Sequence, residues 1–298
     1  MILNGVAVED TFAEAFGMRA TRLILTADTP DWARIAAESL TGFATSVIGC
    51  GCEAGIERLM APEETPDGRP GAAVLIFAVN SAELAKQVLA RVGQSVLTAS
   101  GSACYSGLDA PEAIPVGKSL RFFGDGFQTS KQILGRRYWR VPVMDGEFVV
   151  EDSVGMVRGV GGGNLLILGE SRAQVLAATE RAVAAMRALP NVILPFPGGI
   201  VRSGSKVGSR YKGLVASTND AYCPTLKGMT ASRLDEGIGS VLEIVIDGLT
   251  AEDVAAAMRA GIAALCEVGA AGGLRRISAG NYGGKLGPFQ FHLRELAG

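Results

Sequence analysis

The feature that most constrains the fold of this chain is an internal repeat. Residues 22–56 and 164–200 each read as a short apolar strand, a helix, a β-branched strand and a turn that ends in Gly-Ile. Leu25, Ile48 and Gly55 of the first segment match Leu168, Ile193 and Gly199 of the second, at offsets of 143, 145 and 144. The chain therefore contains two copies of one strand–helix–strand unit.

The same order continues downstream of each copy. An apolar strand at 74–79 precedes a helix from Ser81, and its counterpart at 241–246 precedes a helix capped by Thr250. Closing strands are predicted near 96–99 and at 274–277. Strand–helix–strand repeated twice is typical of the split βαβ, ferredoxin-like unit. We therefore expect an α+β protein with two tandem ferredoxin-like lobes. The alternative is a doubly wound parallel sheet, which is disfavoured because no helix separates the second and third strands of each unit.

A β-rich insertion at 119–160 interrupts the repeat, and Asp145-Gly146 between its apolar strands is a strong hairpin signal. We expect an N-terminal lobe with this insertion over 1–150 and a C-terminal lobe over 151–298. The glycine-rich segment 159–164 is interpreted as a hinge, because the strand after it argues against a phosphate-binding loop. Each lobe has two helices, which cover one sheet face, so the other faces need burial against each other or another subunit.

The composition excludes several classes of protein. Apolar residues make up 48% of the 298 and charged residues 19%, which indicates a substantial core. A net charge of −2 without a basic run argues against nucleic-acid binding. No apolar stretch reaches the ~18 residues of a membrane span, and the start of the chain lacks a secretory signal. We therefore expect a cytoplasmic protein. The five scattered cysteines and the single His292 lack ligand spacing, so no metal site is predicted.

Glu243 is the most informative single residue, because it interrupts the apolar strand Val241–Ile246. Alternation places it on one sheet face with Val241 and Val245. One interpretation is an ordinary glutamate on a solvated face. The other is a desolvated carboxyl with a raised pKa, which stays protonated near neutrality and donates a proton or hydrogen bond.

Three polar segments in the second half, 203–209, 217–224 and 278–287, are rich in hydrogen-bonding groups. Each alone is typical of a turn, but together they are expected to line one cleft. Their candidate substrate-binding residues are Lys206, Ser217, Asn219, Asp220, Tyr222, Asn281 and Lys285. Cys223 is a further candidate as an acyltransferase nucleophile, although no His or cationic cluster adjoins it. His292 is interpreted as a strand-face residue rather than a general base.

Motifs along nearly the whole chain resemble the formylmethanofuran:tetrahydromethanopterin formyltransferase family. They are Ile2–Val6, Glu9–Phe16, Thr41–Phe43, Glu63–Gly71, Phe122–Phe127, Gly146–Phe148, Pro195–Val201, Ser217–Pro224 and Ile277–Gly287. Motifs of this length in this order are highly specific.

The resemblance implies two ferredoxin-like lobes and formyl transfer between the amine of a methanofuran-type carrier and N5 of tetrahydromethanopterin. Both carriers would be co-substrates, with no tightly bound cofactor, and the family's proposed catalytic carboxylate falls on Glu243. Substrates would bind near subunit contacts of a homo-oligomer, commonly a homotetramer.

The near-neutral charge differs from the strongly acidic methanogen members and resembles a bacterial version. In bacteria the family protein can be a subunit of a formyltransferase/hydrolase complex with a metal-dependent amidohydrolase, acting in formaldehyde oxidation towards formate. A non-catalytic scaffold within such a complex is the alternative function.

Overall fold

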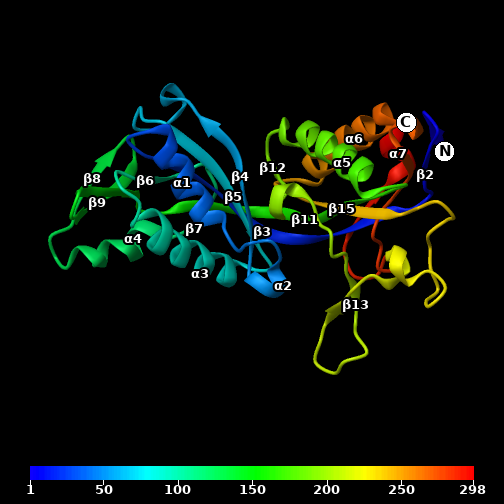
Figure 1. The fold of residues 1–298 in the computed structure, drawn as a ribbon. Coiled ribbons are helices and arrows are strands. Elements are labelled where there is room, and N and C mark those ends of the chain that lie inside the picture. Colours follow the sequence, from blue (N-terminus) through cyan, green and yellow to red (C-terminus); the bar gives the residue numbers. More distant parts are fainter. The chain divides into compact units, whose positions relative to one another are not determined.

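A computed structural model describes all residues, 1–298, and divides them into two units. Unit 1 comprises Met1–Gly17 and Val160–Gly298, and unit 2 comprises Met18–Gly159 (Figure 1). The first 17 residues thus belong with the C-terminal part of the chain and not, as expected from the sequence, with the N-terminal part. They do so because β2 pairs in parallel with β16, and the start of β3 pairs with β17.

Unit 2 contains a mixed sheet in the order β4-β5-β3-β6-β10-β9-β8, in which only β6 and β10 run parallel. Its elements are α1 (Pro30–Thr41), α2 (Val47–Cys50), β4 (Glu53–Met60), β5 (Gly71–Ala78), α3 (Ser81–Arg91), β6 (Ala103–Ser106), β7 (Glu112–Ile114), α4 (Val116–Leu120), β8 (Thr129–Ile133), β9 (Arg136–Val143) and β10 (Gly146–Glu151). Strands β3 (Phe12–Thr26) and β11 (Val154–Gly169) each run through both units. The hairpin predicted around Asp145-Gly146 is confirmed as β9–β10.

Unit 1 contains a sheet in the order β12-β15-β11-β16-β2-β1. Its elements are β1 (Ile2–Leu3), β2 (Val6–Val8), α5 (Arg172–Arg187), β12 (Val192–Ile193), β13 (Lys206–Val207), β14 (Ala216–Ser217), β15 (Ser240–Gly248), α6 (Ala251–Val268), β16 (Leu274–Ser278), β17 (Phe289–His292) and α7 (Leu293–Ala297). Thr250 caps α6 as predicted, because its side chain accepts a hydrogen bond from the Asp253 N–H.

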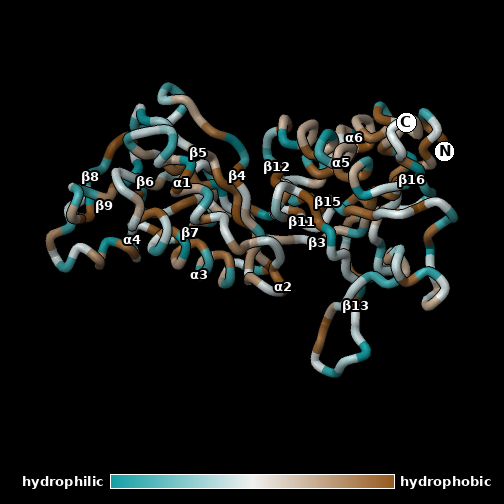
Figure 2. The backbone as a smooth tube through the Cα atoms, in the orientation of Figure 1, coloured by the Kyte–Doolittle hydropathy of each residue, from teal (hydrophilic) through white to brown (hydrophobic).

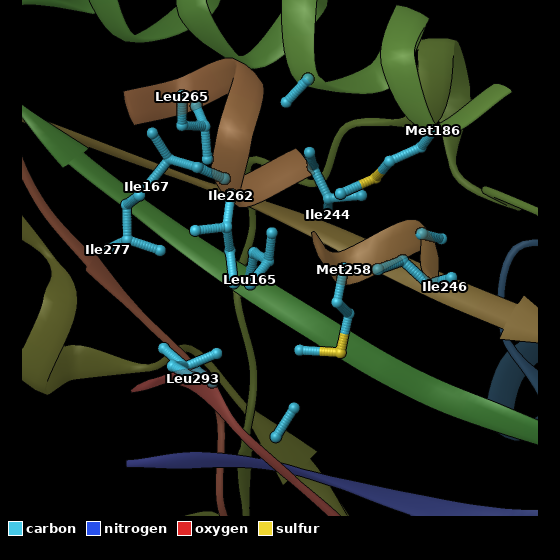
Figure 3. Packing of buried hydrophobic residues seen from close by; sticks show 14 of the residues in the cluster. Leu165, Ile167, Met186, Ile244, Ile246, Met258, Ile262, Leu265, Ile277 and Leu293 are labelled. Carbon is cyan, nitrogen blue, oxygen red and sulfur yellow. The ribbon is translucent and has the colours of Figure 1, made fainter. Parts of the chain in front are cut away.

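The core of unit 1 lies between α5, α6 and one face of this sheet. Figure 3 shows Met186 from α5 and Met258 and Ile262 from α6 packed over strand residues such as Leu165 and Ile244. Figure 1 shows both helices on one side of the sheet, with the segment that contains β13 on the other. The opposite sheet face is therefore not covered by α5 or α6.

Three local predictions are wrong. The β-branched strand expected around Ile48 is replaced by the short helix α2, because Ser46 caps it and Gly51 ends it in a left-handed conformation. The strand expected near 96–99 is replaced by a π-helical turn, Val92–Val96, and the closing strand β6 comes later. The glycine-rich segment 159–164 is no hinge loop, since it lies inside β11, where a bulge accommodates Gly162 at φ +91°.

Candidate active site

Glu243 lies on the face of the unit 1 sheet that the helices leave uncovered. Ile244 and Ile246, its alternating neighbours, are buried in the helix-side core, as the strand alternation predicts. In the register of the sheet Glu243 lies opposite Leu166 of β11. On its other side it exchanges two backbone hydrogen bonds with Val201, of 2.9 and 2.7 Å. The carboxyl is thus held in the middle of a hydrogen-bonded sheet.

A loop segment covers this face in place of a helix. Tyr222, Leu234 and Ile238 pack against Leu166 and its neighbours Leu168 and Val241. Within this segment, residues 222–238, the Nζ of Lys227 donates hydrogen bonds to the carbonyl oxygens of Asp235 (2.9 Å) and Ile238 (2.7 Å). These bonds hold the first part of the segment to its end. The sequence predicted that one face of the sheet would have no helix to cover it. This face is partly buried by a loop segment of the same unit.

The enclosure changes the acidity of Glu243. Its side chain is half-buried, and burial alone raises the pKa of Glu243 from 4.5 to about 7. An ionised carboxylate loses hydration in such an environment, so the neutral acid is favoured. Near neutral pH this residue is therefore able both to donate and to accept a proton.

The candidate binding residues of 203–224 gather at the base of one hairpin. Strands β13 and β14 pair Lys206 with Ser217, whose hydroxyl donates to the Gly208 carbonyl at 2.7 Å. The ammonium of Lys206 forms an ion pair with Asp220, which lowers the pKa of that carboxyl. Asn219 begins the 3₁₀ turn Asp220–Tyr222. Tyr222 then connects this hairpin to the sheet face of Glu243.

The hairpin itself projects from unit 1 (Figure 1) and contains hydrophobic residues (Figure 2), four of which are exposed. They are Val207, Tyr211, Leu214 and Val215, and Tyr211 is 76% exposed. The structure shows nothing that covers them.

The third polar segment follows β16. Ser278, the last residue of β16, lies opposite Leu166, on the other side of β11 from Glu243. Asn281 donates a hydrogen bond to the Thr11 hydroxyl at 2.8 Å, while Lys285 is exposed. Tyr282 is half-buried, and burial together with the nearby charge of Glu243 raises the pKa of its phenol. Contacts and register therefore connect all three polar segments to the strands around Glu243.

Two residues that the sequence did not single out hold this last segment. Glu14 accepts hydrogen bonds from four of its backbone N–H groups, and Asn164 bonds both to the N–H and to the carbonyl of Gly280. The signal for Glu14 was the same as for Glu243, a carboxylate inside an apolar strand. Its partners lie near the other end of the chain.

The remaining candidates have simpler surroundings. The thiol of Cys223 lies 3.4 Å from the Thr218 hydroxyl and 3.4 Å from the Asn219 carbonyl oxygen, so no base adjoins it. His292 is exposed at the end of β17, with its ring against Phe12, as the strand pattern predicted. In residues 1–298 no three His, Cys, Asp or Glu side chains are grouped so that they could hold a metal ion. None of the helices has the length and hydrophobicity that a bilayer crossing requires.

Together the fold and the site define a two-part α+β protein with a half-buried carboxylic acid beneath polar loops, a construction suited to acid–base group transfer. A family model described as formylmethanofuran-tetrahydromethanopterin formyltransferase matches residues 1–143, and a second, described as the family's proximal lobe, matches residues 146–296. The chain belongs to this family, which confirms the resemblance carried by the motifs.

Relatives from this family cover nearly the whole chain. The formyltransferase of Methylococcus capsulatus is 65% identical over 296 residues, with 99% of each chain covered. A component of the formyltransferase/hydrolase complex of Methylorubrum extorquens is 58% identical over 300 residues, with 99% of this chain and 96% of that protein covered.

Two solved structures have the same fold. One is the formyltransferase/hydrolase complex from Methylorubrum extorquens in complex with methylofuran, with a TM-score of 0.97 at 57% identity over 99% of this chain and 98% of that chain. The other is the formyltransferase from Methanosarcina barkeri, with a TM-score of 0.93 at 48% identity over 99% of this chain and 100% of that chain.

Proposed function

We propose that this chain transfers a formyl group between the amine of a methanofuran-type carrier and N5 of tetrahydromethanopterin, with Glu243 as the acid–base residue. Family membership supplies the reaction. The observation that carries the role of Glu243 is its half-buried position on a sheet face, where the pKa of its carboxyl is about 7. A group that is partly protonated at neutral pH is suited to proton transfer in both directions.

The reaction needs such a group because a formamide is a poor acyl donor. The free amine attacks the formyl carbon, and the carbonyl oxygen gains negative charge in a tetrahedral intermediate. The C–N bond to the departing amine breaks only when that nitrogen is protonated. Neutral Glu243 donates this proton and recovers one from the attacking amine, so the enzyme ends in its starting state.

The polar segments supply the substrate-binding groups of this proposal. Lys206, Asn219 and Asn281 orient the two carriers through their ammonium and amide groups. Ser217, Asp220, Tyr222 and Lys285 complete the set.

Glu243→Gln tests the proposal, because the amide keeps the size of the side chain and removes the proton it transfers. We expect turnover to fall by about 100-fold or more, while calorimetry shows both carriers still bound. Glu252→Gln makes the same change on the exposed side of α6, where Glu252 pairs with Arg259, and should leave turnover unchanged. Full turnover by Glu243→Gln with both carriers bound would contradict the assignment.

The same assay on the isolated wild-type chain tests the alternative of a non-catalytic scaffold. Formyl exchange between the two carriers would exclude that alternative.

We also propose that the chain forms two ferredoxin-like lobes, at 1–150 and 151–298 apart from residues 1–17, which belong with the second lobe. The strand orders β4-β5-β3-β6 and β12-β15-β11-β16 support this, because each corresponds to the sequence order 2-3-1-4.

The assembly and cellular role belong to the same proposal. We infer a cytoplasmic homo-oligomer, with a tetramer as the expected form, or a subunit of a complex with a metal-dependent amidohydrolase. The Methylorubrum extorquens relative, which is part of a formyltransferase/hydrolase complex, supports the second arrangement. In a bacterium the formyl group would pass from the pterin to the carrier and onward to formate.

A further inference from the structure

Glu14 is a fully buried carboxylate, with 0% of the residue exposed, between Ala13 and Ala15 of β3. Its Oε2 accepts hydrogen bonds from the N–H groups of Tyr282 (2.8 Å) and Gly284 (2.9 Å). Its Oε1 accepts them from the following stretch of the same turn, at 2.5 Å from Leu286 and 2.7 Å from Gly287. Burial acts to raise the pKa of Glu14, but these four donors outweigh it and lower the pKa below its usual value. Glu14 is therefore ionised at neutral pH.

The turn that provides these donors, residues 280–287, contains no helix or strand. Gly283 and Gly284 have φ of +87° and +68°, a region that favours glycine. At its start, the buried amide of Asn164 accepts from the Gly280 N–H at 2.6 Å and donates to the Gly280 carbonyl at 3.3 Å. Two buried side chains, rather than regular secondary structure, thus define the path of this turn.

The turn starts from a strand that is separated from the strand of the proposed acid–base residue by β11 alone. It begins after β16, whose Ser278 and the Glu243 of β15 are both opposite Leu166 of the intervening strand β11. Tyr282, on the turn, packs its ring against Phe16, with centroids 6.2 Å apart. Burial, and then the charges of Glu243 and Glu14, raise the pKa of the Tyr282 phenol, which places this side chain near both carboxyls.

We propose that Glu14 is a positioning residue: its carboxylate fixes the 280–287 turn, so that Tyr282 stays beside Glu243 and keeps water from the Glu243 carboxyl. The inference deepens the proposed function and rests on it. The two carboxyls then differ in protonation state. N–H donors stabilise the ionised form of Glu14, whereas apolar surroundings favour the neutral form of Glu243.

The other titratable and charged groups on this side of the sheet do not account for the state of Glu243. Tyr222 comes from the covering segment, and Arg276 of β16 is paired with Glu9 at 3.1 Å and Asp235 at 3.2 Å. Burial is the single cause of the Glu243 shift. The groups that exclude water from the Glu243 carboxyl therefore determine its pKa.

Glu14→Gln tests the proposal, because the amide cannot offer two acceptor oxygens to four N–H groups. We expect the loosened turn to admit water, the pKa of Glu243 to fall by about one unit, and the loss of activity at alkaline pH to begin about one unit lower. Since the protonated fraction falls tenfold per pH unit above the pKa, kcat at pH 8 should drop about tenfold. An unchanged pH profile and kcat would overturn the proposal.

Two controls separate positioning from general destabilisation. Glu252→Gln repeats the chemical change on an exposed helix surface and should match the wild type in both kcat and pH profile. Ile262→Val removes a methylene from the helix-side core, so it should lower Tm without moving the pH profile. A shifted profile in Ile262→Val would assign the effect to stability and overturn the positioning role.

Infrared titration of the Glu243 carboxyl distinguishes failure of this inference from failure of the proposed function. The band of Glu243 is identified by its absence in Glu243→Gln, and its pKa is then compared in the wild type and Glu14→Gln. A lower pKa in Glu14→Gln supports the positioning role even where Glu243→Gln turns over normally, which would defeat only the proposed function. An unchanged pKa overturns the positioning role.

Hydrogen exchange of the wild-type protein covers the case in which Glu14→Gln does not fold. The amide protons of Tyr282, Gly284, Leu286 and Gly287 should be as protected as those of β16, although they lie outside any strand. Exchange at the rate of an open loop would overturn the proposal.

Discussion

At Glu243 the carboxyl meets the apolar surface of Leu166 and the segment above it, whereas four N–H groups surround the carboxylate of Glu14. The same side chain therefore has a raised pKa at one position, where we propose that it donates a proton, and is a fixed anion at the other. The orientation of Glu243 was predictable from strand alternation alone. The partners of Glu14 were not, because they lie 268 to 273 residues away and become neighbours only in the folded sheet.

The raised pKa of Glu243 has a consequence for stability. The unfolded carboxyl titrates near 4.5 and the folded one near 7, so between these values only the folded chain retains the proton. Below pH 4.5 Glu243 does not lower the free energy of unfolding. As the pH rises from 4.5 to 7, that free energy falls by about 3 kcal/mol. Urea unfolding at pH 5 and pH 8 should show most of this loss in the wild type but not in Glu243→Gln, whose amide does not titrate. An equal pH dependence in both proteins would contradict the raised pKa.

At the scale of the elements, the segment Tyr222–Ile238 covers the candidate site although, apart from short 3₁₀ turns, it has no regular secondary structure. It packs against the strand residues around Glu243, and Lys227 closes it through two backbone carbonyls. Periodicity could locate the helices and central strands, because their apolar stripes repeat. It could not locate this cover, since irregular segments carry no period, and it mistook α2 for a strand, because Val47-Ile48 has β propensity while Ser46 and Gly51 decide the local structure.

Lys227→Met keeps most of the length of the side chain and removes both hydrogen bonds. Because Lys227 is exposed, the change in global stability should stay within about 1 kcal/mol. The segment itself should open more often, so a protease of broad specificity should cleave within residues 228–237 faster than in the wild type. Lys131→Met, at an exposed lysine of β8, should leave the cleavage rate unchanged. Equal cleavage of both variants would show that Lys227 does not close the segment.

For the whole molecule, unit 2 leaves surface that a monomer would expose to water. All five residues of the edge strand β8 are exposed, and Phe122 and Phe127 are exposed by 67% and 79%. Unpaired strand edges and exposed aromatic groups favour association with another chain. The sequence predicted uncovered sheet faces from helix counting and a β-rich insertion at 119–160 with an unprotected edge, and β8 lies within that insertion.

We expect the protein to associate at micromolar concentration and to lose specific activity as subunits separate on dilution. Sedimentation velocity over a dilution series, with activity measured on the same samples, tests this. A species of 30.8 kDa with undiminished specific activity would contradict it.

Unit 1 is assembled from the two ends of the chain, with all of unit 2 between them. During synthesis residues 18–159 emerge with every partner they need, so unit 2 is able to fold on the ribosome. Residues 12–15 must wait for 289–292, their partners in β17, and closing a loop of that length is slow. The 280–287 turn held by Glu14 therefore forms only after the last residues have left the ribosome, so a chain released early would carry a folded unit 2 and an incomplete candidate site.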